Sequence, residues 1–431
     1  MIASDDNVIR EPARETPVLA ETDVLVVGGG VAGVSAAVAA AREGARVVLA
    51  ERPTYLGGLA TGGLIIMLLT MDDGRGQQVI AGLCQETVDR MAARGAAYAP
   101  PRDHWGSTED SLIEHYRGWG LVNGHGPHTV RYSVAYDAEE MKFAFEQMCR
   151  DAGVRLLYSV LATDPIRDGD RLRGIVFQGK EGRFAVRAEV VIDTSGDGDV
   201  FAGAGCAHEV EEVAPWLWFT MGGVHDVDAA QAAGARCVKT LGAGHVLMPR
   251  GAADRISRRI DATKTDDITF AAVECRELVM EEVDRLRREV PGFAEAHLCH
   301  IADQLDVTES RRLLGEHLLT REEMDQPCDD VIAVTGHWTK YDSLYHIPYT
   351  SLLPRELSNL LVAGRCISVD HRVHHATKEI PACMATGEAA GVAASLALES
   401  GGSVKEISVS RVQHRLEAAG AIVRVGRPAP R

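Results

Sequence analysis

The sequence predicts an α/β protein built on a parallel β-sheet, with one domain that is discontinuous in sequence and interrupted by a smaller α+β domain. Three observations predict this organisation: a glycine-rich corner between two apolar runs near the N-terminus, later apolar runs typical of buried parallel strands, and a long intervening stretch of mixed patterning. The chain has 431 residues, which exceeds the usual size of one hydrophobic core, so two interleaved domains are expected.

The first patterned stretch, DVLVVGGGVAGVSAAVAAAREGARVVLAER, covers residues 23–52. Asp23–Val27 is apolar and β-rich, Val31–Arg42 is rich in alanine with a helical period, and Ala45–Ala50 is apolar again. The order of these patterns predicts a strand, a helix and a second strand.

The glycines at the corner of this unit form the pattern G-x-G-x-x-G, with Gly28, Gly30 and Gly33 at its glycine positions. The first glycine permits a tight turn, the second lets a pyrophosphate approach the backbone, and the third lets the helix pack on the strand. The free N–H groups at the start of the helix favour phosphate. Glu51 ends the second strand, where an acid is expected to bind a ribose hydroxyl. The unit therefore predicts a Rossmann-like dinucleotide site.

The glycine pairs that follow Glu51, in RPTYLGGLATGGL, distinguish this chain from a nicotinamide domain, which would continue into another helix. At this point the sequence resembles the FAD-dependent oxidoreductases whose flavin domain is shared with fumarate reductase and succinate dehydrogenase flavoproteins. The resemblance implies FAD as the cofactor. Fumarate reductases often attach the flavin through a His just after this glycine pair, whereas Leu59, Ala60 and Thr61 follow here. We therefore predict noncovalent FAD.

The resemblance recurs in four later segments. Tyr136–Asp164 looks like the family's helix and strand that return to the flavin domain, and Ala188–Gly205 looks like its strand ending in Thr-Gly-Asp-Gly-Asp, with Ser195 inserted. Asn359–Ser368 looks like its C-terminal strand and Ile380–Leu398 like its flavin-facing helix. Pro381 in the first turn of that last helix would direct N–H groups near Met384 to Thr386 at the flavin pyrimidine. The residues predicted to bind the cofactor are Gly28, Gly30, Val31, Ala32, Gly33, Glu51, Arg52, Gly57, Gly58, Thr61, Gly62, Leu161, Thr194, Gly196, Asp197, Gly364, Arg365, Met384, Ala385 and Thr386.

These matches predict the domain organisation. The expected parts are an N-terminal arm (1–22), a first part of the FAD-binding domain with an insertion at about 72–130 (23–205), a substrate or cap domain (206–345), a second part of the FAD-binding domain (346–400), and a C-terminal helix and tail (401–431). Within the cap, Glu274–Gly292 is predicted to be an amphipathic helix stopped by Pro291, with a solvated charged face. We expect the last residues, GRPAPR, to form a frayed tail.

The stretch GRCISVDHRVHHATKEIP, residues 364–381, has the densest supply of ionisable groups for catalysis. Family resemblance places this loop beside the flavin ring. We predict that His371, His374 or His375 moves the proton, because imidazole titrates near working pH; the alternative for each is a hydrogen bond to the loop backbone alone. Arg365 and Lys378 would bind flavin or an anionic substrate group. We predict no metal site, since no carboxylate completes an evident triad with these histidines and the resemblance implies no need for a metal.

The stretch TESRRLLGEHLLTREEM, residues 308–324, resembles a family signature and is interpreted as a helix that contains a capping box at Thr320 and Glu323. Arg311 and Arg312 lie on it, and one of the two is expected to face inward; Arg312 is predicted to bind a substrate carboxylate, with a surface salt bridge as the alternative. His337 and His346, around an aromatic stretch, rank lower as pocket residues.

The predicted function is an FAD-dependent oxidoreductase that transfers hydride between a small organic molecule and flavin N5, as a dehydrogenase or oxidase. The alternatives are reduction of an activated double bond, flavin monooxygenation, and a non-catalytic FAD-binding scaffold. An external electron donor or acceptor, such as oxygen, a quinone or a reductase, would complete the cycle.

Partners and location follow from composition. The formal net charge of −17 argues against nucleic acid or an anionic membrane as a partner. The nine cysteines contain no C-x-x-C pair and no Cys/His ligand spacing, so we expect free thiols in a reducing compartment. We find no signal-peptide pattern at the N-terminus, and the apolar run Leu59–Met71 is too short to span a bilayer. A soluble cytoplasmic protein is expected, and homo-oligomerisation is left open.

Overall fold

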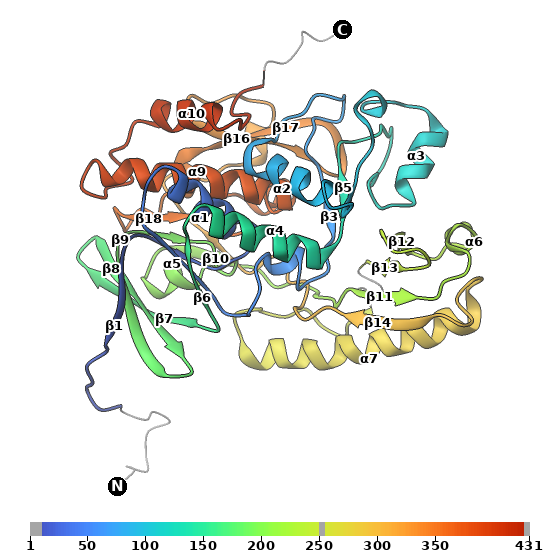
Figure 1. Cartoon of the computed structure of the whole chain (residues 1–431), viewed down its shortest axis with the longest axis horizontal. Coiled ribbons are helices and arrows are strands. Elements are labelled where there is room, and N and C mark those ends of the chain that lie inside the picture. The colour runs from blue at the N-terminus through green and yellow to red at the C-terminus, as the bar shows by residue number, and fades with distance from the viewer. Residues whose placement is uncertain (1–10, 250–254, 426–431) are drawn as a thin grey trace.

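The computed structural model describes residues 11–249 and 255–425 and confirms the α/β fold (Figure 1). Its main sheet has seven strands in the order β6-β2-β1-β9-β8-β7, and β18 pairs with β9 off this path. The strands are β1 (Val18–Val27), β2 (Val47–Glu51), β6 (Arg155–Tyr158), β7 (Leu161–Asp168), β8 (Arg171–Gly179), β9 (Gly182–Asp193) and β18 (Leu360–Val362).

The strands around the glycine corner are parallel, as predicted. β1 pairs in parallel with β2 and β9, β2 with β6, and β18 with β9, whereas β7, β8 and β9 form an antiparallel extension. β1 begins at Val18, earlier than the predicted Asp23, because Val18 to Thr22 pair with the N-terminal half of β9. The C-terminal strand β18 thus returns to the sheet that the N-terminal strands begin.

Two helices from opposite ends of the sequence, α1 (Val31–Arg42) and α9 (Ile380–Leu398), pack side by side on this sheet (Figure 1). Their backbones approach closely: a Cβ on Gly387 would lie 2.1 Å from the carbonyl oxygen of Ala32, and one on Gly391 would lie 2.2 Å from that of Ala36. α9 is long and apolar enough to cross a membrane, but 89% of its apolar window is buried inside the protein. Burial of that extent identifies it as a core helix of this fold.

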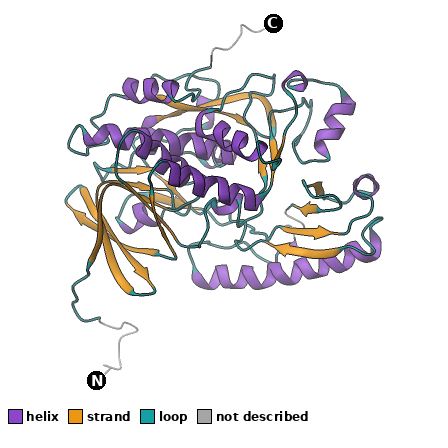
Figure 2. Cartoon of the chain, viewed as in Figure 1, coloured by secondary structure: helices purple, strands orange, loops and turns teal. Residues whose placement is uncertain are grey.

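Figure 2 shows the remaining helices and strands. A four-stranded sheet of order β12-β13-β11-β14 lies beside the long helix α7, away from α1 and α9 (Figure 1). The helices are α2 (Gly82–Ala92), α3 (Asp110–Arg117), α4 (Ala138–Asp151), α5 (Asp199–Gly203), α6 (Val227–Ala232), α7 (Thr265–Glu289), α8 (His371–Thr377) and α10 (Val409–Ala418). The strands are β3 (Met67–Leu68), β4 (Ala97–Tyr98), β5 (Val134–Tyr136), β10 (His208–Val210), β11 (Phe219–Gly222), β12 (Val238–Lys239), β13 (Val246–Met248), β14 (His297–Ile301), β15 (Arg311–Leu313), β16 (Val331–His337) and β17 (Lys340–Pro348).

The predicted amphipathic helix is present as α7, which ends at Glu289, two residues before Pro291. The predicted signature helix is wrong in its first part. Arg311–Leu313 is the strand β15, which pairs antiparallel with β10, so its hydrogen bonds come from a segment about 100 residues away that local pattern cannot report. The capping box of Thr320 and Glu323 is confirmed, at a short 3₁₀ turn. The expected tail at 426–431 lies outside the described residues.

Glu388 of α9 gives the fold a predicted pH dependence. Its side chain is buried, and its carboxylate accepts a hydrogen bond from the Leu83 N–H in the first turn of α2 at 3.0 Å. Burial raises the pKa of Glu388 from 4.5 to about 7. Between these two pH values, Glu388 is protonated in the folded protein and ionised in the unfolded chain. The free energy of unfolding therefore falls as the pH rises through this range.

Glu388→Gln is expected to remove that part of the slope, on the order of 3 kcal/mol. Urea unfolding of both proteins at about pH 5 and about pH 8, on either side of the titration, measures the difference. An unchanged pH dependence in the variant would contradict the assignment to Glu388.

Candidate active site

A cavity of about 720 Å³ lies at the carboxyl ends of the parallel strands. Its lining includes Val27 at the end of β1, Glu51 at the end of β2, Thr194 after β9 and Ala363 after β18. This is the edge at which open α/β sheets bind ligands, and the volume is typical of a cofactor site. The lining continues to Trp218, Asp306 and Trp338 from the middle of the chain, so one cavity joins both regions.

The three motif glycines have different surroundings in the structure. Gly28 has a φ of +101°, and a Cβ there would meet the carbonyl of Thr194 at 2.5 Å. A Cβ on Gly33 would lie 1.8 Å from the carbonyl oxygen of Gly28, which forces this helix position to be glycine. A Cβ on Gly30 would meet nothing within 4 Å, and Gly30 lines the cavity. Only the absence of a side chain at Gly30 leaves this part of the cavity open to a ligand.

Glu51 lies at the cavity wall beside the glycine corner. Its carboxylate accepts hydrogen bonds from the backbone N–H of Gly29 and from that of Arg52, the latter at 2.6 Å. Burial raises the pKa of Glu51 above its ordinary value. The backbone bonds orient the carboxylate at the position expected for a ribose ligand.

The loop after β9 forms another wall of the cavity. Buried Asp193 accepts hydrogen bonds from Ser195 and from the first N–H groups of α5, which holds the loop in place. Arg365, which follows β18, donates to the Gly196 carbonyl at 2.9 Å and pairs with Asp197 at 2.6 Å. Arg365 therefore joins the loop after β18 to the loop after β9.

Most of the predicted cofactor residues line this cavity. They are Gly28, Gly30, Val31, Ala32, Glu51, Arg52, Gly57, Gly58, Leu161, Thr194, Gly196, Asp197, Gly364 and Arg365. The predicted residues outside the lining are Gly33, Thr61, Gly62, Met384, Ala385 and Thr386. Met384 and Thr386 are fully buried in the core, and the start of α9 instead reaches the cavity through Ile380 and Cys383. The contact point is thus one helical turn earlier than predicted.

Comparisons with known proteins decide the family. The model of the family described as FAD dependent oxidoreductase matches residues 23–416. This chain belongs to that family. A search of curated proteins gave no match.

Two solved structures share the fold of this FAD-dependent oxidoreductase. A p-nitrophenol 4-monooxygenase from Pseudomonas putida has a TM-score of 0.51 at 12% identity, with 92% of this chain and 84% of that chain covered. A geranylgeranyl bacteriochlorophyll reductase-like protein from Thermoplasma acidophilum has a TM-score of 0.50 at 15% identity, with 93% and 83% covered.

The cavity of this FAD-dependent oxidoreductase fits the cofactor that its family implies. The open surface over Gly30 and the oriented carboxylate of Glu51 suit the pyrophosphate and ribose. At the other end, Asp306 Oδ1 and Trp338 Nε1 are buried polar atoms without a hydrogen-bond partner among the described residues. Buried polar atoms normally have partners, so these two are available to a bound cofactor or substrate.

Noncovalent attachment of FAD stays a prediction. Leu59 and Ala60 follow Gly58 and line the cavity, so no His stands directly after the glycine pair. In the described lining, Cys383 is the only Cys, His or Tyr side chain, and burial raises its pKa to about 12, which keeps it a thiol.

The predicted catalytic group lies elsewhere. His371, His374, His375 and Arg312 are outside the described lining of the cavity. Residues 371–377 form the helix α8, which turns His374 into the interior, where burial lowers the pKa of His374 well below its ordinary value. Arg312 is buried and pairs with Glu309 at 2.5 Å and Glu209 at 3.1 Å, so its guanidinium is occupied within the protein. His337 and His346 are also buried outside the lining, and burial lowers the pKa of His337 to about 4.

Sequence reasoning missed the residues that line the cavity opposite the glycine corner. Trp338 lies in the aromatic stretch between His337 and His346 and lines the cavity, whereas the prediction named only the two histidines as pocket residues. Asp306 carries no local motif; its Oδ2 accepts a hydrogen bond from Trp218 Nε1 at 2.7 Å. Lys378, which is predicted to bind flavin or an anionic substrate group, does line the cavity, where it approaches Glu379 at 3.5 Å.

Proposed function

We propose that this protein is a dehydrogenase or oxidase that removes hydride from a small organic molecule bound between Trp218, Asp306 and Trp338. The observation that carries the proposal is the free, buried Oδ1 of Asp306 in the wall of the cavity that begins at the glycine corner. When bound, FAD supplies the hydride acceptor of the reaction. The protein must then orient the substrate and accept one proton.

Asp306 is suited to accept that proton. Its Oδ2 is held by the indole N–H of Trp218 at 2.7 Å, which leaves Oδ1 as the reacting oxygen. Its side chain is 3% exposed, so bulk water competes little for it. The indoles of Trp218 and Trp338 supply apolar walls against which a substrate carbon can be positioned.

Lys378 is the cation that we assign to an anionic group of the substrate. Its side chain is largely buried at the cavity wall and has Glu379 Oε1 as a neighbour at 3.5 Å. Arg365, the other predicted cation, already pairs with Asp197. Lys378 therefore has more capacity than Arg365 to bind an incoming carboxylate.

The proposal is tested on the purified protein with FAD bound, by adding small alcohols, amines and acids without oxygen. Bleaching of the flavin bands by one compound, and their return with oxygen, would support an oxidase. Return only with a quinone or another acceptor would support a dehydrogenase. The assay also tests the reactions named for the structural neighbours. If only an external donor bleaches the flavin bands, reoxidation of the flavin by an activated alkene would replace our proposal by a reductase. Reoxidation by oxygen with hydroxylation of the substrate would replace it by a monooxygenase. A flavin that no small donor reduces would favour a scaffold.

Asp306→Asn is expected to slow flavin reduction by the substrate by roughly 10² to 10⁴-fold, because the amide cannot accept the proton. Asparagine is isosteric and keeps the oxygen that accepts from Trp218, so FAD content should not change. Asp303→Asn is the matched control, since Asp303 also lines the cavity but its side chain is 54% exposed. Stopped-flow spectroscopy measures both rates. Equal rates in wild type and Asp306→Asn would remove Asp306 from the reaction.

A further inference from the structure

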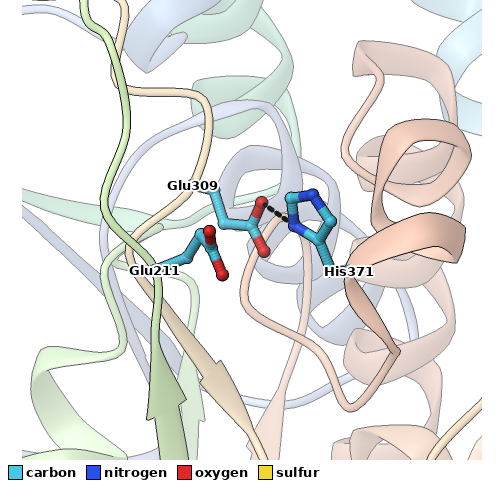
Figure 3. Close-up of side chains that lie close together, drawn as sticks. All are labelled: Glu211, Glu309 and His371. Carbon is cyan, nitrogen blue, oxygen red and sulfur yellow. Dashed lines mark hydrogen bonds and ion pairs between the residues drawn. The ribbon is translucent and has the colours of Figure 1, made fainter. Parts of the chain in front are cut away.

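Two acids and two histidines outside the described cavity lining come together from distant parts of the sequence. Glu211 follows β10, Glu309 precedes β15, and His371 and His374 lie on α8. Figure 3 shows the carboxylates of Glu211 and Glu309 and the ring of His371 converging on one space. The ligand atoms of these three residues lie within 4.8 Å of one another.

One oxygen of Glu309 is the centre of the group. His371 Nδ1 lies 2.9 Å from Glu309 Oε2, and His374 Nδ1 lies 3.5 Å from the same oxygen. Two ligands about 2.1 Å from a common ion are separated by about 3.0 Å at a right angle and about 3.4 Å at the tetrahedral angle. Both distances match those of ligands around one small cation; the shorter one is also a hydrogen bond between His371 and Glu309, which a bound cation would replace.

The hydrogen bonding of His374 leaves a lone pair directed at this centre. His374 Nε2 lies 3.0 Å from the carbonyl oxygen of Arg365, which can only accept, so Nε2 carries the hydrogen. Nδ1 then presents its lone pair towards Glu309 Oε2, which is also an acceptor. The His374 side chain is 1% exposed and that of Glu309 is 4% exposed. Glu309 Oε2 has His371 as its hydrogen-bond partner, whereas the lone pair of His374 Nδ1 faces an acceptor, and a cation between the two atoms would satisfy it.

The surroundings orient the carboxylate as the outer shell of a metal site does. Arg312 Nε pairs with Glu309 Oε1 at 2.5 Å and leaves Oε2 turned towards the imidazoles. Glu209, Glu211 and Glu309 carry three negative charges, against which stand Arg312 and, 3.8 Å from Glu211, Arg259. The group therefore keeps an excess of negative charge.

We propose that Glu211, Glu309, His371 and His374 form a binding site for a divalent first-row transition metal ion of the Zn²⁺ type. Mixed imidazole and carboxylate ligands suit such ions, whereas Mg²⁺ prefers oxygen alone. The side chains of His371 and Glu211, 50% and 35% exposed, leave a path from solvent. The ion would tie α8 to the β10–β15 pair and so fix the start of the segment that carries Lys378 into the cavity. This inference revises the prediction of no metal site and is independent of the proposed reaction.

The test uses the full-length protein with FAD bound, stripped with a chelator and titrated with Zn²⁺ by calorimetry. We expect one strongly bound Zn²⁺ per chain, a rise in Tm with Zn²⁺, and no comparable response to the same concentration of Mg²⁺. His371→Ala and Glu211→Gln change partly exposed side chains and are expected to weaken Zn²⁺ binding at least about tenfold. Their flavin spectra report whether they fold.

The matched control is His317→Ala, because His317 and Glu323 form an isolated His–Glu pair at 2.7 Å of similar exposure. This variant is expected to bind Zn²⁺ as the wild type does. The proposal would be overturned by absence of Zn²⁺ binding, by binding that survives both His371→Ala and Glu211→Gln, or by equal affinity for Mg²⁺.

Discussion

Gly30→Val is expected to weaken FAD binding by at least about tenfold while the protein still folds. The added side chain would project into the cavity, since a Cβ at Gly30 meets no protein atom within 4 Å and Gly30 lines the cavity. Filling space that a ligand needs costs about 1–3 kcal/mol or more. Valine accepts the backbone of this position, which has a φ of −64° and a ψ of 179°. Fluorescence titration of the FAD-free protein with FAD measures the change.

Two further variants separate ligand binding from folding. Gly30→Ala should give a smaller loss of FAD affinity, because it adds only a methyl group. Gly33→Ala should instead lower the stability of the FAD-free protein, since its Cβ would overlap the carbonyl oxygen of Gly28 at 1.8 Å. Normal FAD affinity in Gly30→Val would show that the pyrophosphate does not pass over this glycine.

Arg131→Met is expected to lower the free energy of unfolding by about 3–5 kcal/mol, because it leaves a buried carboxylate without its cation. Arg131 Nε donates to Asp72 Oδ1 at 2.7 Å, and the two side chains are 1% and 0% exposed. The same guanidinium donates to Thr70 Oγ1 at 2.9 Å and lies over the ring of Tyr341 at 4.8 Å. The pair thus joins the segment after Leu69 of the cavity wall to the β16–β17 hairpin. Urea unfolding followed by circular dichroism measures the loss.

Arg173→Met is the control for this prediction. Arg173 pairs with Asp168 at 2.9 Å, but the side chains are 53% and 66% exposed, so its removal should cost at most about 1 kcal/mol. A similar small loss in Arg131→Met would mean that water reaches Asp72 and that the buried pair does not hold the segment after Leu69 against the β16–β17 hairpin.

The cofactor half of the site was predictable from sequence because its residues follow one another in a short unit. Gly28 and Gly30 of the corner, the acid Glu51 and the glycines 57 and 58 line the cavity, whereas Gly33 packs against Gly28. The start of α9 was predicted to the right helix but to the wrong turn: Ile380 and Cys383 line the cavity, and Met384 faces the core. A periodic apolar helix does not reveal which of its faces meets a ligand when all of them are buried.

The substrate half was not predictable in this way. A dense group of histidines indicates chemistry, but α8 directs His371 and His374 towards Glu309, whose position depends on the pairing of β15 with β10. Asp306 became a candidate only because the fold buries one of its oxygens without a partner beside Trp218. Neither contact has a trace in the local pattern.

The sequence by itself determined the strand–helix–strand unit, the turn at the glycine corner, the acid at the end of β2, the helix α7 and the Thr320 cap, since each depends on steric and hydrogen-bonding preferences within a few residues. Only the tertiary structure decided that residues 311–313 form a strand, that the histidines leave the cavity, and that Asp306, Trp338 and Lys378 meet the nucleotide end of the same cavity. These outcomes depend on which distant segments share a core and satisfy each other's buried polar groups, and that balance is settled between segments, not within them.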